Sequence, residues 1–152
     1  MAPDPTTFDR VFKFVILGDK SVNNEKVLII ATVSQKWKEC LLKENNAVVL
    51  VFSTTDVCSF EYTLELYNEI QNTTEKMPVV FIENKMDIVE SSQMEKEIVE
   101  GEIRKKHKRL YRVSALKEFN VMHPFAYLIE KLTRQKKDHN ANESLSERSI
   151  RL

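Results

Sequence analysis

Four short stretches of almost uninterrupted apolar residues recur along the chain, and polar residues follow each of them. They span Val11–Leu17, Ala47–Ser53, Pro78–Glu83 and Leu110–Val113. Continuous apolar runs of this length are typical of strands in a parallel sheet that is covered on both faces. Segments in which apolar residues recur at helical spacing lie between and after these runs, so the pattern predicts an α/β fold.

Two of the helical segments begin with residues that favour a helix N-terminus. Asp56 can cap a helix that ends near Ile70, because its side-chain oxygen can accept a hydrogen bond from a backbone N–H of the first turn. Ser92 and Glu95 form a possible capping box. We therefore expect a second helix from Gln93 to about residue 106.

The last predicted helix leads into a polar end of the chain. Asn120 would cap this helix. From Gln135 onward the sequence has too little apolar surface to order itself, which predicts a disordered polar tail over 136–152. The domain would then span 11–135, after an N-terminal extension over 1–10. The apolar face of the last helix consists of Val121, Phe125, Leu128 and Leu132.

Residues 24–44 fit two different structures. Val27–Val33 resembles a strand in its composition, but only about nine residues separate it from the first strand. A crossover between parallel strands needs a dozen residues or more. We therefore favour a helix from about Asn24 to Leu42, with the strand as the alternative.

Composition and charge narrow the class of protein. Lys+Arg and Asp+Glu both number 23, so no net charge attracts the chain to nucleic acid. Cys40 and Cys58 are too few for a disulfide framework, which favours a reduced, cytoplasmic compartment. We expect no intrinsic membrane anchor, because Ala2 replaces the glycine that myristoylation needs and no cysteine lies near Leu152 for prenylation. The histidines lack metal-ligand spacing, so we expect no metal site.

Polar residues with candidate chemistry follow the third and fourth predicted strands. Ligands bind at the carboxyl ends of strands in open α/β sheets. In Asn84-Lys85-Met86-Asp87, the carboxylate could accept two hydrogen bonds from a guanine edge, the amide could bridge loops and the lysine stem could cover a flat ring. Backbone N–H groups at Ser114 and Ala115 could meet a purine carbonyl. An ordinary polar turn is the alternative interpretation.

The first predicted strand ends in a degenerate phosphate-loop sequence. A phosphate loop has the form GxxxxGK[ST], in which the lysine contacts the β- and γ-phosphates and the hydroxyl binds magnesium. In the eight corresponding residues, Asn23, Asn24 and Glu25 replace the second glycine, the lysine and the hydroxyl residue. The carboxylate would repel phosphate. The part of the loop that remains consists of Gly18, Asp19, Lys20, Ser21 and Val22.

Taken in chain order, LVFSTTD…SFE, NKMD and YRVSALKEFNV…FAYLIEKL resemble the C-terminal two-thirds of a Rab-type small GTPase of the Ras superfamily. The resemblance is nearest to the Rab branch associated with cilia and Hedgehog signalling. It covers 47–135 well and 12–22 loosely. It implies a three-layer small-GTPase-like fold with a mostly parallel sheet, and Rab-type effectors or regulators as protein partners. It also implies a GTP or GDP site: Asn84, Lys85 and Asp87 would bind the base, Ser114 and Ala115 would assist, and Gly18, Asp19, Lys20, Ser21 and Val22 would be the phosphate-loop remnant.

The chain also departs from that family. It has no room for the first switch, with its magnesium-binding threonine, or for the following strand hairpin, so we expect a reduced fold and a lost Mg²⁺ site. If Ile30–Lys36 is the remnant of the family motif WDTAGQE, Ala31 replaces the aspartate and Gln35 keeps the position of the water-orienting glutamine. The shortening fits evolutionary loss, and it also fits a splicing or gene-prediction artefact.

Three functional hypotheses follow. The first is a Rab-like GTPase that binds guanine nucleotide weakly, has little or no hydrolysis and acts in vesicle or ciliary traffic. The second is a nucleotide-free pseudo-GTPase that binds proteins, and the third is a non-functional shortened product. Losing the phosphate-loop lysine and the magnesium-linked groups would weaken nucleotide binding by roughly 5–9 kcal/mol, or about four to six orders of magnitude.

Overall fold

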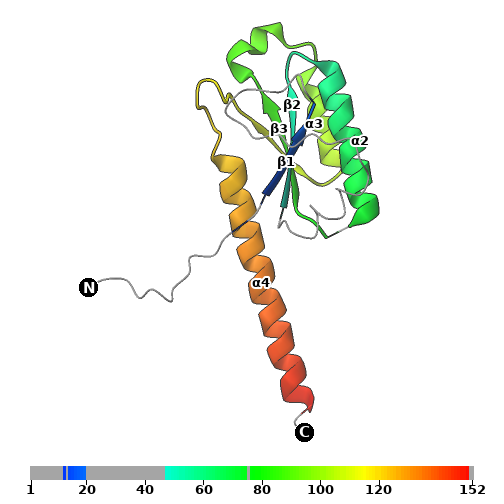
Figure 1. Ribbon diagram of the computed structural model, residues 1–152, viewed down its shortest axis with the longest axis vertical. Helices are drawn as coiled ribbons and strands as arrows, with labels where there is room; N and C mark the ends of the chain where they lie inside the picture. Colours follow the sequence, from blue (N-terminus) through cyan, green and yellow to red (C-terminus); the bar gives the residue numbers. More distant parts are fainter. Residues whose placement is uncertain (1–11, 13, 20–46, 75, 151–152) are drawn as a thin grey trace, which may run out of the picture.

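The computed structural model describes residue 12 and residues 14–19, 47–74 and 76–150 (Figure 1). Its sheet contains β1 (Phe14–Gly18), β2 (Ala47–Ser53), β3 (Val79–Asn84) and β4 (Arg109–Arg112), in the order β1-β2-β3-β4. All three pairings are parallel. The four predicted strands are confirmed: β2 has the predicted bounds, and the ends of the other three differ by one to three residues from those predicted.

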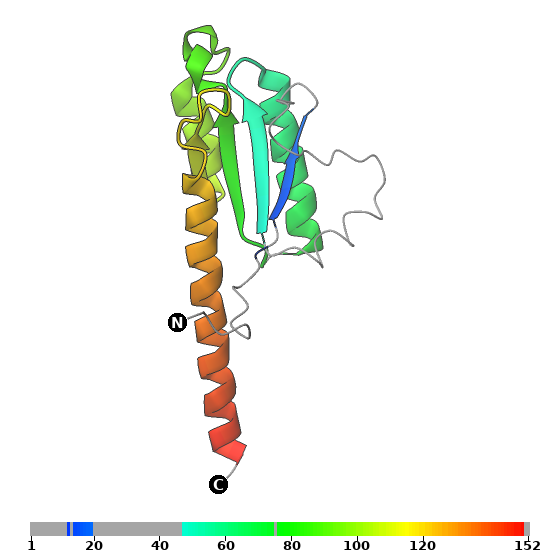
Figure 2. The same ribbon diagram turned by 60° about the vertical axis from the view of Figure 1, so that its left-hand side comes forward.

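The helices cover both faces of this sheet. They are α2 (Val57–Thr73), the 3-10 helix η2 (Met86–Ser91), α3 (Lys96–Lys105) and α4 (His123–Ile150). Helices α2 and α3 lie on one face, and α4 crosses the other (Figures 1 and 2). The result is the three-layer α/β architecture that the sequence predicted, with a sheet that is parallel throughout its described strands.

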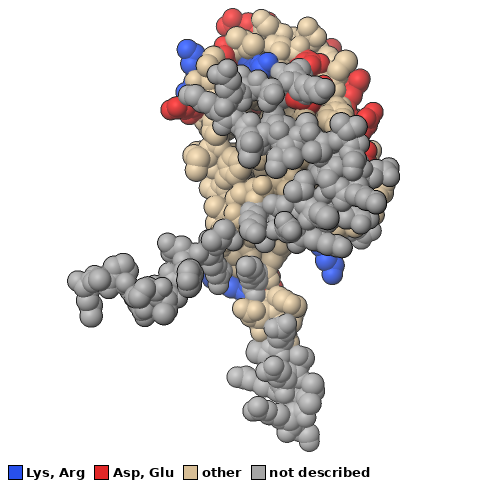
Figure 3. All heavy atoms as spheres, viewed as in Figure 1, with Lys and Arg blue, Asp and Glu red and all other residues tan. Residues whose placement is uncertain are grey.

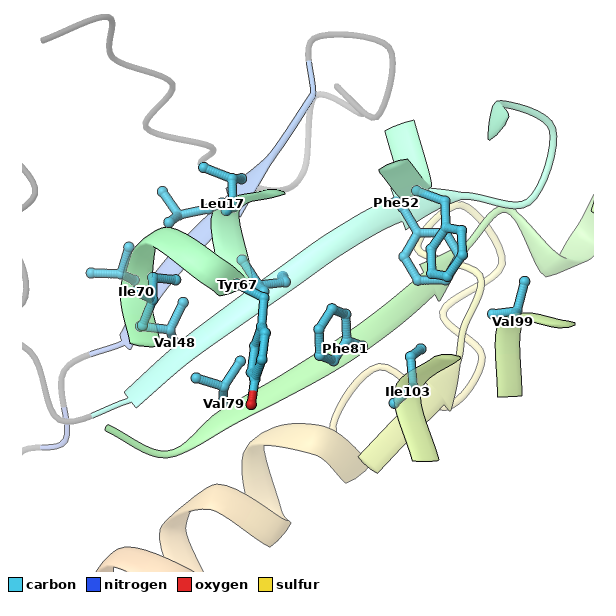
Figure 4. Packing of buried hydrophobic residues seen from close by; sticks show 13 residues of the cluster. Leu17, Val48, Phe52, Tyr67, Ile70, Val79, Phe81, Val99 and Ile103 are labelled. Atoms are coloured by element: carbon cyan, nitrogen blue, oxygen red, sulfur yellow. The ribbon is translucent and has the colours of Figure 1, made fainter. Parts of the chain in front are cut away.

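The larger core lies between the sheet and helices α2 and α3. Strand β2 is buried along its whole length, because alternate residues face opposite helical layers. On this side Phe52 packs against Phe60 of α2 with ring centroids 4.7 Å apart, and Phe81 of β3 packs against Tyr67 of α2 at 5.6 Å. Figure 4 shows the rings of Phe52, Tyr67 and Phe81 in the space between β2, β3 and the helices.

The second core lies between the opposite face of the sheet and α4. It contains Val49 and Val51 of β2, Ile82 of β3, and Leu128 and Leu132 of α4. The two leucines are four residues apart and so lie on the same face of the helix. Of the predicted apolar stripe, these two leucines and Phe125 meet the sheet, since Phe125 packs against Phe14 of β1 with ring centroids 5.5 Å apart. Val121 precedes the helix, which begins at His123.

The predicted helix caps have different outcomes. Asp56 is confirmed as the N-cap of α2, where its Oδ1 accepts a hydrogen bond from the Ser59 backbone N–H at 3.2 Å. The capping box at Ser92 is wrong, because α3 begins at Lys96 and the Ser92 hydroxyl instead donates to the backbone oxygen of Thr54 at 3.2 Å. That bond ties the end of η2 to the loop after β2.

The predicted start and end of the last helix also need correction. Asn120 does not cap α4: the helix begins at His123, and the Asn120 side chain donates to the backbone oxygen of Arg112 at 3.0 Å. Helix α4 continues to Ile150, through residues for which composition predicted a polar tail. Adding a residue to an existing helix adds one hydrogen bond per residue fixed, so the packed first turns support a polar extension.

Two further predictions concern other parts of the chain. The helix or strand expected within 24–44 lies outside the described residues, as do Ala31 and Gln35. The N-terminal extension over 1–10 lies there too. In the part of the chain that the structure describes, no helix combines the length and the apolar character that crossing a membrane requires.

Candidate functional site

Three loops meet where β2, β3 and β4 end. The Thr54 backbone N–H donates to the backbone oxygen of Asn84 at 3.1 Å, which joins the ends of β2 and β3. The Met86 N–H donates to the Val113 oxygen at 3.1 Å and joins the ends of β3 and β4. Because the strands are parallel, these contacts bring segments that are far apart in sequence together at one edge of the sheet.

Asn84 bridges two of these loops through its side chain, as the sequence predicted. It is the last residue of β3 and is 2% exposed. Its Oδ1 accepts a hydrogen bond from the Ala115 backbone N–H at 3.1 Å. The sequence analysis predicted that this Ala115 N–H would donate to a purine carbonyl. In the structure it donates to the Asn84 side chain instead.

Asp87 and Ser114 form the second contact across these loops. The Ser114 hydroxyl donates to Asp87 Oδ1 at 2.6 Å, and its oxygen accepts the Lys117 backbone N–H at 3.1 Å. Ser114 is 2% exposed, whereas Asp87 is an exposed residue. The buried hydroxyl therefore holds one carboxylate oxygen while the carboxyl group stays accessible from solvent.

The turn between these residues has an uncommon backbone conformation. Lys85 has φ 66° and ψ 35°, in the left-handed region that is unfavourable for a residue with a Cβ atom. Its carbonyl accepts the Ile88 N–H at 3.0 Å as η2 begins. Strained residues of this kind cluster at binding sites, and this one separates the buried Asn84 from the exposed Asp87.

Gly18 ends β1 beside the other strand ends, and its lack of a side chain is needed there. A Cβ atom at this position would lie 2.6 Å from the Val51 backbone oxygen. Its φ is not positive, so contact with β2, and not backbone conformation, requires glycine. Asp19 follows and is half-buried. Lys20, Ser21 and Val22 lie outside the described residues.

A charged cluster next to the site was not predicted. Glu83 is 4% exposed, and its Oε2 accepts a hydrogen bond from Arg112 Nε at 2.9 Å. Arg112 Nη1 donates to Glu100 Oε1 at 2.7 Å, which connects β3, β4 and α3. The hydrogen bond from Arg112 lowers the pKa of Glu100. One feature of the sequence could have indicated this cluster: Glu83 is a charged residue at the end of an otherwise apolar predicted strand, and a buried carboxylate needs a cationic partner.

The side chains do not gather as metal ligands. Over residues 14–19, 47–74 and 76–150, no three His, Cys, Asp or Glu side chains lie close enough together to hold a metal ion. The arrangement at the strand ends is instead that of a hydrogen-bonding site. A buried amide and a buried hydroxyl orient the groups of two loops around one exposed carboxylate.

The sequence profile of the Ras family matches residues 34–134, which is about two thirds of the 152-residue chain. The chain belongs to the Ras family. This Ras-family domain is that of a small GTPase, and its matched part contains both loops of the candidate site. The match begins after Val22, so β1 and the phosphate-loop remnant lie outside the matched residues.

Proposed function

We propose that this small GTPase is a Rab-type homologue that binds guanine nucleotide weakly and hydrolyses it little or not at all. Asn84, Lys85 and Asp87 would bind the base, with Ser114 and Ala115 in support. The chain would act in vesicle or ciliary traffic through Rab-type effectors or regulators. It would be cytoplasmic and reach membranes through those partners.

The observation that supports this proposal best is the contact between Ser114 and Asp87. A hydroxyl that donates to one carboxylate oxygen fixes the plane of the carboxyl group. The described residues show no hydrogen bond to the other oxygen, Oδ2, which can accept the ring and exocyclic N–H groups of guanine. Adenine has no ring N–H at the corresponding position, so this carboxylate would select guanine.

The Asn84 amide fits the same ligand after one adjustment. Its Oδ1 holds the Ala115 N–H in the structure, so the carbonyl of guanine would compete for that donor. A rotation of the amide would free the N–H for the base and turn the Asn84 NH₂ group towards a ring nitrogen. The exchange would keep the Ala115 N–H paired and add a hydrogen bond between the Asn84 amide and the base.

Weak affinity follows from the phosphate side of the site. Glu25 stands where the phosphate loop has its magnesium-binding hydroxyl, and Asn24 stands where it has lysine. On the face shown in Figure 3, acidic and basic side chains both lie at the upper end of the molecule, where Figure 1 shows the strands ending. A carboxylate in place of the phosphate-loop hydroxyl disfavours an anionic triphosphate.

Binding of fluorescent GDP to the purified chain tests the proposal. We expect micromolar binding that depends little on Mg²⁺ and is displaced by GTP but not by ATP. Asp87→Ala should abolish it, whereas Glu90→Ala, which removes an exposed carboxylate from the same short helix, should leave it unchanged. Failure to bind at high micromolar concentration, in a chain with a cooperative unfolding transition, would contradict the proposal.

A second candidate function is supported by exposed apolar side chains close to the site. Leu116, Phe119 and Met122 follow β4 and are 62%, 60% and 71% exposed. Exposed apolar groups of this size within one loop favour protein contacts. If nucleotide binding fails, a nucleotide-free pseudo-GTPase that binds proteins through this loop becomes the better explanation.

A further inference from the structure

A basic pocket lies at the end of the sheet opposite the candidate nucleotide site. Pro78 precedes β3 and Lys108 precedes β4, so both lie at the amino ends of parallel strands. Helix α4 passes over this end and adds Lys131. The pocket has a volume of about 380 Å³ and is lined by Lys76, Met77, Pro78, Lys108, Lys131 and Gln135.

The charge in this pocket has one sign. Three lysines and no acidic residue line it, and among the described residues none of the three forms an ion pair. Lys108 is half-buried. Burial lowers its pKa, and the positive charge of Lys131 lowers it further. The folded chain thus holds the Lys108 ammonium group in a setting that disfavours its charge.

The pocket wall is held in place by the fold. The Pro78 oxygen accepts the Val48 N–H at 2.9 Å, which fixes the entry into β3 beside β2. The Lys131 ammonium lies 5.9 Å from the centroid of the Tyr127 ring, which favours its position on the sheet side of α4. The start of β4 and helix α4 therefore position Lys108 and Lys131.

We propose that this pocket binds a small polyanion carrying two or more phosphate groups. Lysine is a compact phosphate-binding charge with three N–H donors, so three lysines supply more donors than one phosphate needs. The volume lies within the range of small-molecule sites, which is about 300–1,000 Å³. A bound polyanion would offset the repulsion between Lys108 and Lys131. This site is independent of guanine binding.

The adjoining hollow on α4 shows why the first pocket is preferred. It is lined by Arg109, Arg134 and Lys131, but also by Glu130 and Asp138. Arg134 is paired with Glu130, and the Arg109 guanidinium lies 4.2 Å from the Tyr127 ring centroid. Its cations thus have partners or acidic neighbours. Of these two hollows, the lysine pocket is the one that presents positive charge without acidic side chains.

Titration calorimetry with inorganic tripolyphosphate at constant ionic strength tests this proposal. Lys108→Gln and Lys131→Gln should each weaken binding about tenfold, as expected when one charged hydrogen bond is lost. Lys137→Gln removes the same charge from an exposed position on α4 and should change affinity less than about twofold. Equal effects of all three substitutions, or no binding at millimolar concentration, would overturn the proposal.

Two further measurements separate the sources of the ligand and the sites. Flotation with vesicles that contain a phosphoinositide bisphosphate, compared with neutral vesicles, shows whether the phosphates can belong to a lipid headgroup. Binding of tripolyphosphate or of these vesicles supports the proposal if it requires Lys108. Asp87→Ala should retain tripolyphosphate binding. If it does not, the phosphates occupy the nucleotide site and the pocket proposal fails. The pocket variants should melt at or above the wild-type temperature, because each removes repulsion.

Discussion

The Ser114 hydroxyl donates a hydrogen bond to the Asp87 carboxylate at 2.6 Å, although 27 residues separate the two in sequence. Strand β4 and helix α3 lie between them in the chain, and the parallel pairing of β3 with β4 brings them together. The contact turns two loops into one site. Because Asp87 is exposed, the hydrogen bond does more to orient its carboxylate than to stabilise the fold.

Ser114→Ala should therefore weaken nucleotide binding more than it weakens the fold. We expect an affinity loss of roughly tenfold, because the carboxylate loses one charge-assisted partner. The free energy of unfolding should fall by about 1 kcal/mol, since the Lys117 N–H also loses its acceptor. Fluorescent-GDP titration and urea unfolding measure the two effects. Ser91→Ala at an exposed position should change neither, and an unchanged affinity in Ser114→Ala would contradict the assignment.

The two glycines of the chain should respond in opposite directions to substitution by alanine. Gly18→Ala places a Cβ atom 2.6 Å from the Val51 oxygen, so strands β1 and β2 must separate at a cost of about 1–3 kcal/mol. Gly101 lies within α3, and a Cβ atom added to it would meet nothing within 4 Å, so Gly101→Ala should stabilise by roughly 0.5–1 kcal/mol. Urea unfolding of both variants checks the pair. Equal changes in the free energy of unfolding would show that β1 and β2 can accommodate a Cβ atom at position 18 without cost.

Periodicity predicted the layers of this fold better than its boundaries. The runs at Ala47–Ser53 and Pro78–Glu83 identified the central strands, because a strand buried on both faces is apolar at every position. Helix starts were less predictable. Ser92 has the residue type of a cap, but its hydroxyl has a partner in Thr54, which lies 38 residues away. The sequence does not show that the Ser92 hydroxyl binds Thr54 instead of capping α3, because the contact depends on the fold.

The residues of the candidate site were predicted, but only part of their hydrogen bonding was. The bridge from Asn84 to the next loop was expected, whereas the hydrogen bond from the Ser114 hydroxyl to Asp87 was not. The partnership of Glu83 with Arg112 was missed because β4 is short and its pattern is mixed. Distances between strands depend on register, and a single sequence does not show register.

Arg112→Met should destabilise the fold strongly. Glu83 has a side chain that is 6% exposed, and the substitution leaves its carboxylate buried without the guanidinium. Removing one partner of a buried ion pair costs about 3–5 kcal/mol. Chemical denaturation measures the loss.

The control for this prediction is the exposed pair between Lys105 and Glu102, whose side chains are 72% and 36% exposed. Lys105→Met should change stability by less than about 1 kcal/mol. In the Arg112→Met background, Glu83→Gln should recover part of the loss, because a neutral amide is less costly to bury than a charge. If Arg112→Met and Lys105→Met lowered the free energy of unfolding by similar amounts, the Glu83 carboxylate would be well solvated without its arginine.

The same arginine gives the fold a dependence on acid pH through Glu100. The hydrogen bond from Arg112, with weaker charge contributions from Arg112, Lys96 and Arg104, lowers the Glu100 pKa from 4.5, against a smaller opposing effect of burial. A carboxyl group whose pKa is lower in the folded than in the unfolded state stabilises the fold above the unfolded pKa. That contribution should disappear as the pH falls through the lowered value.

A double-mutant cycle of Arg112→Met and Glu100→Gln, measured by urea unfolding at neutral pH and at successively lower pH, tests this dependence. The coupling between the two residues should be favourable at neutral pH and should vanish once Glu100 is protonated in the folded state, because a neutral carboxyl no longer attracts the guanidinium. In the Arg112→Met background, Glu100→Gln should have little effect at any pH, since the largest cause of the pKa shift is gone. A coupling that stays constant across the titration would mean that Arg112 and Glu100 interact by packing and not by charge.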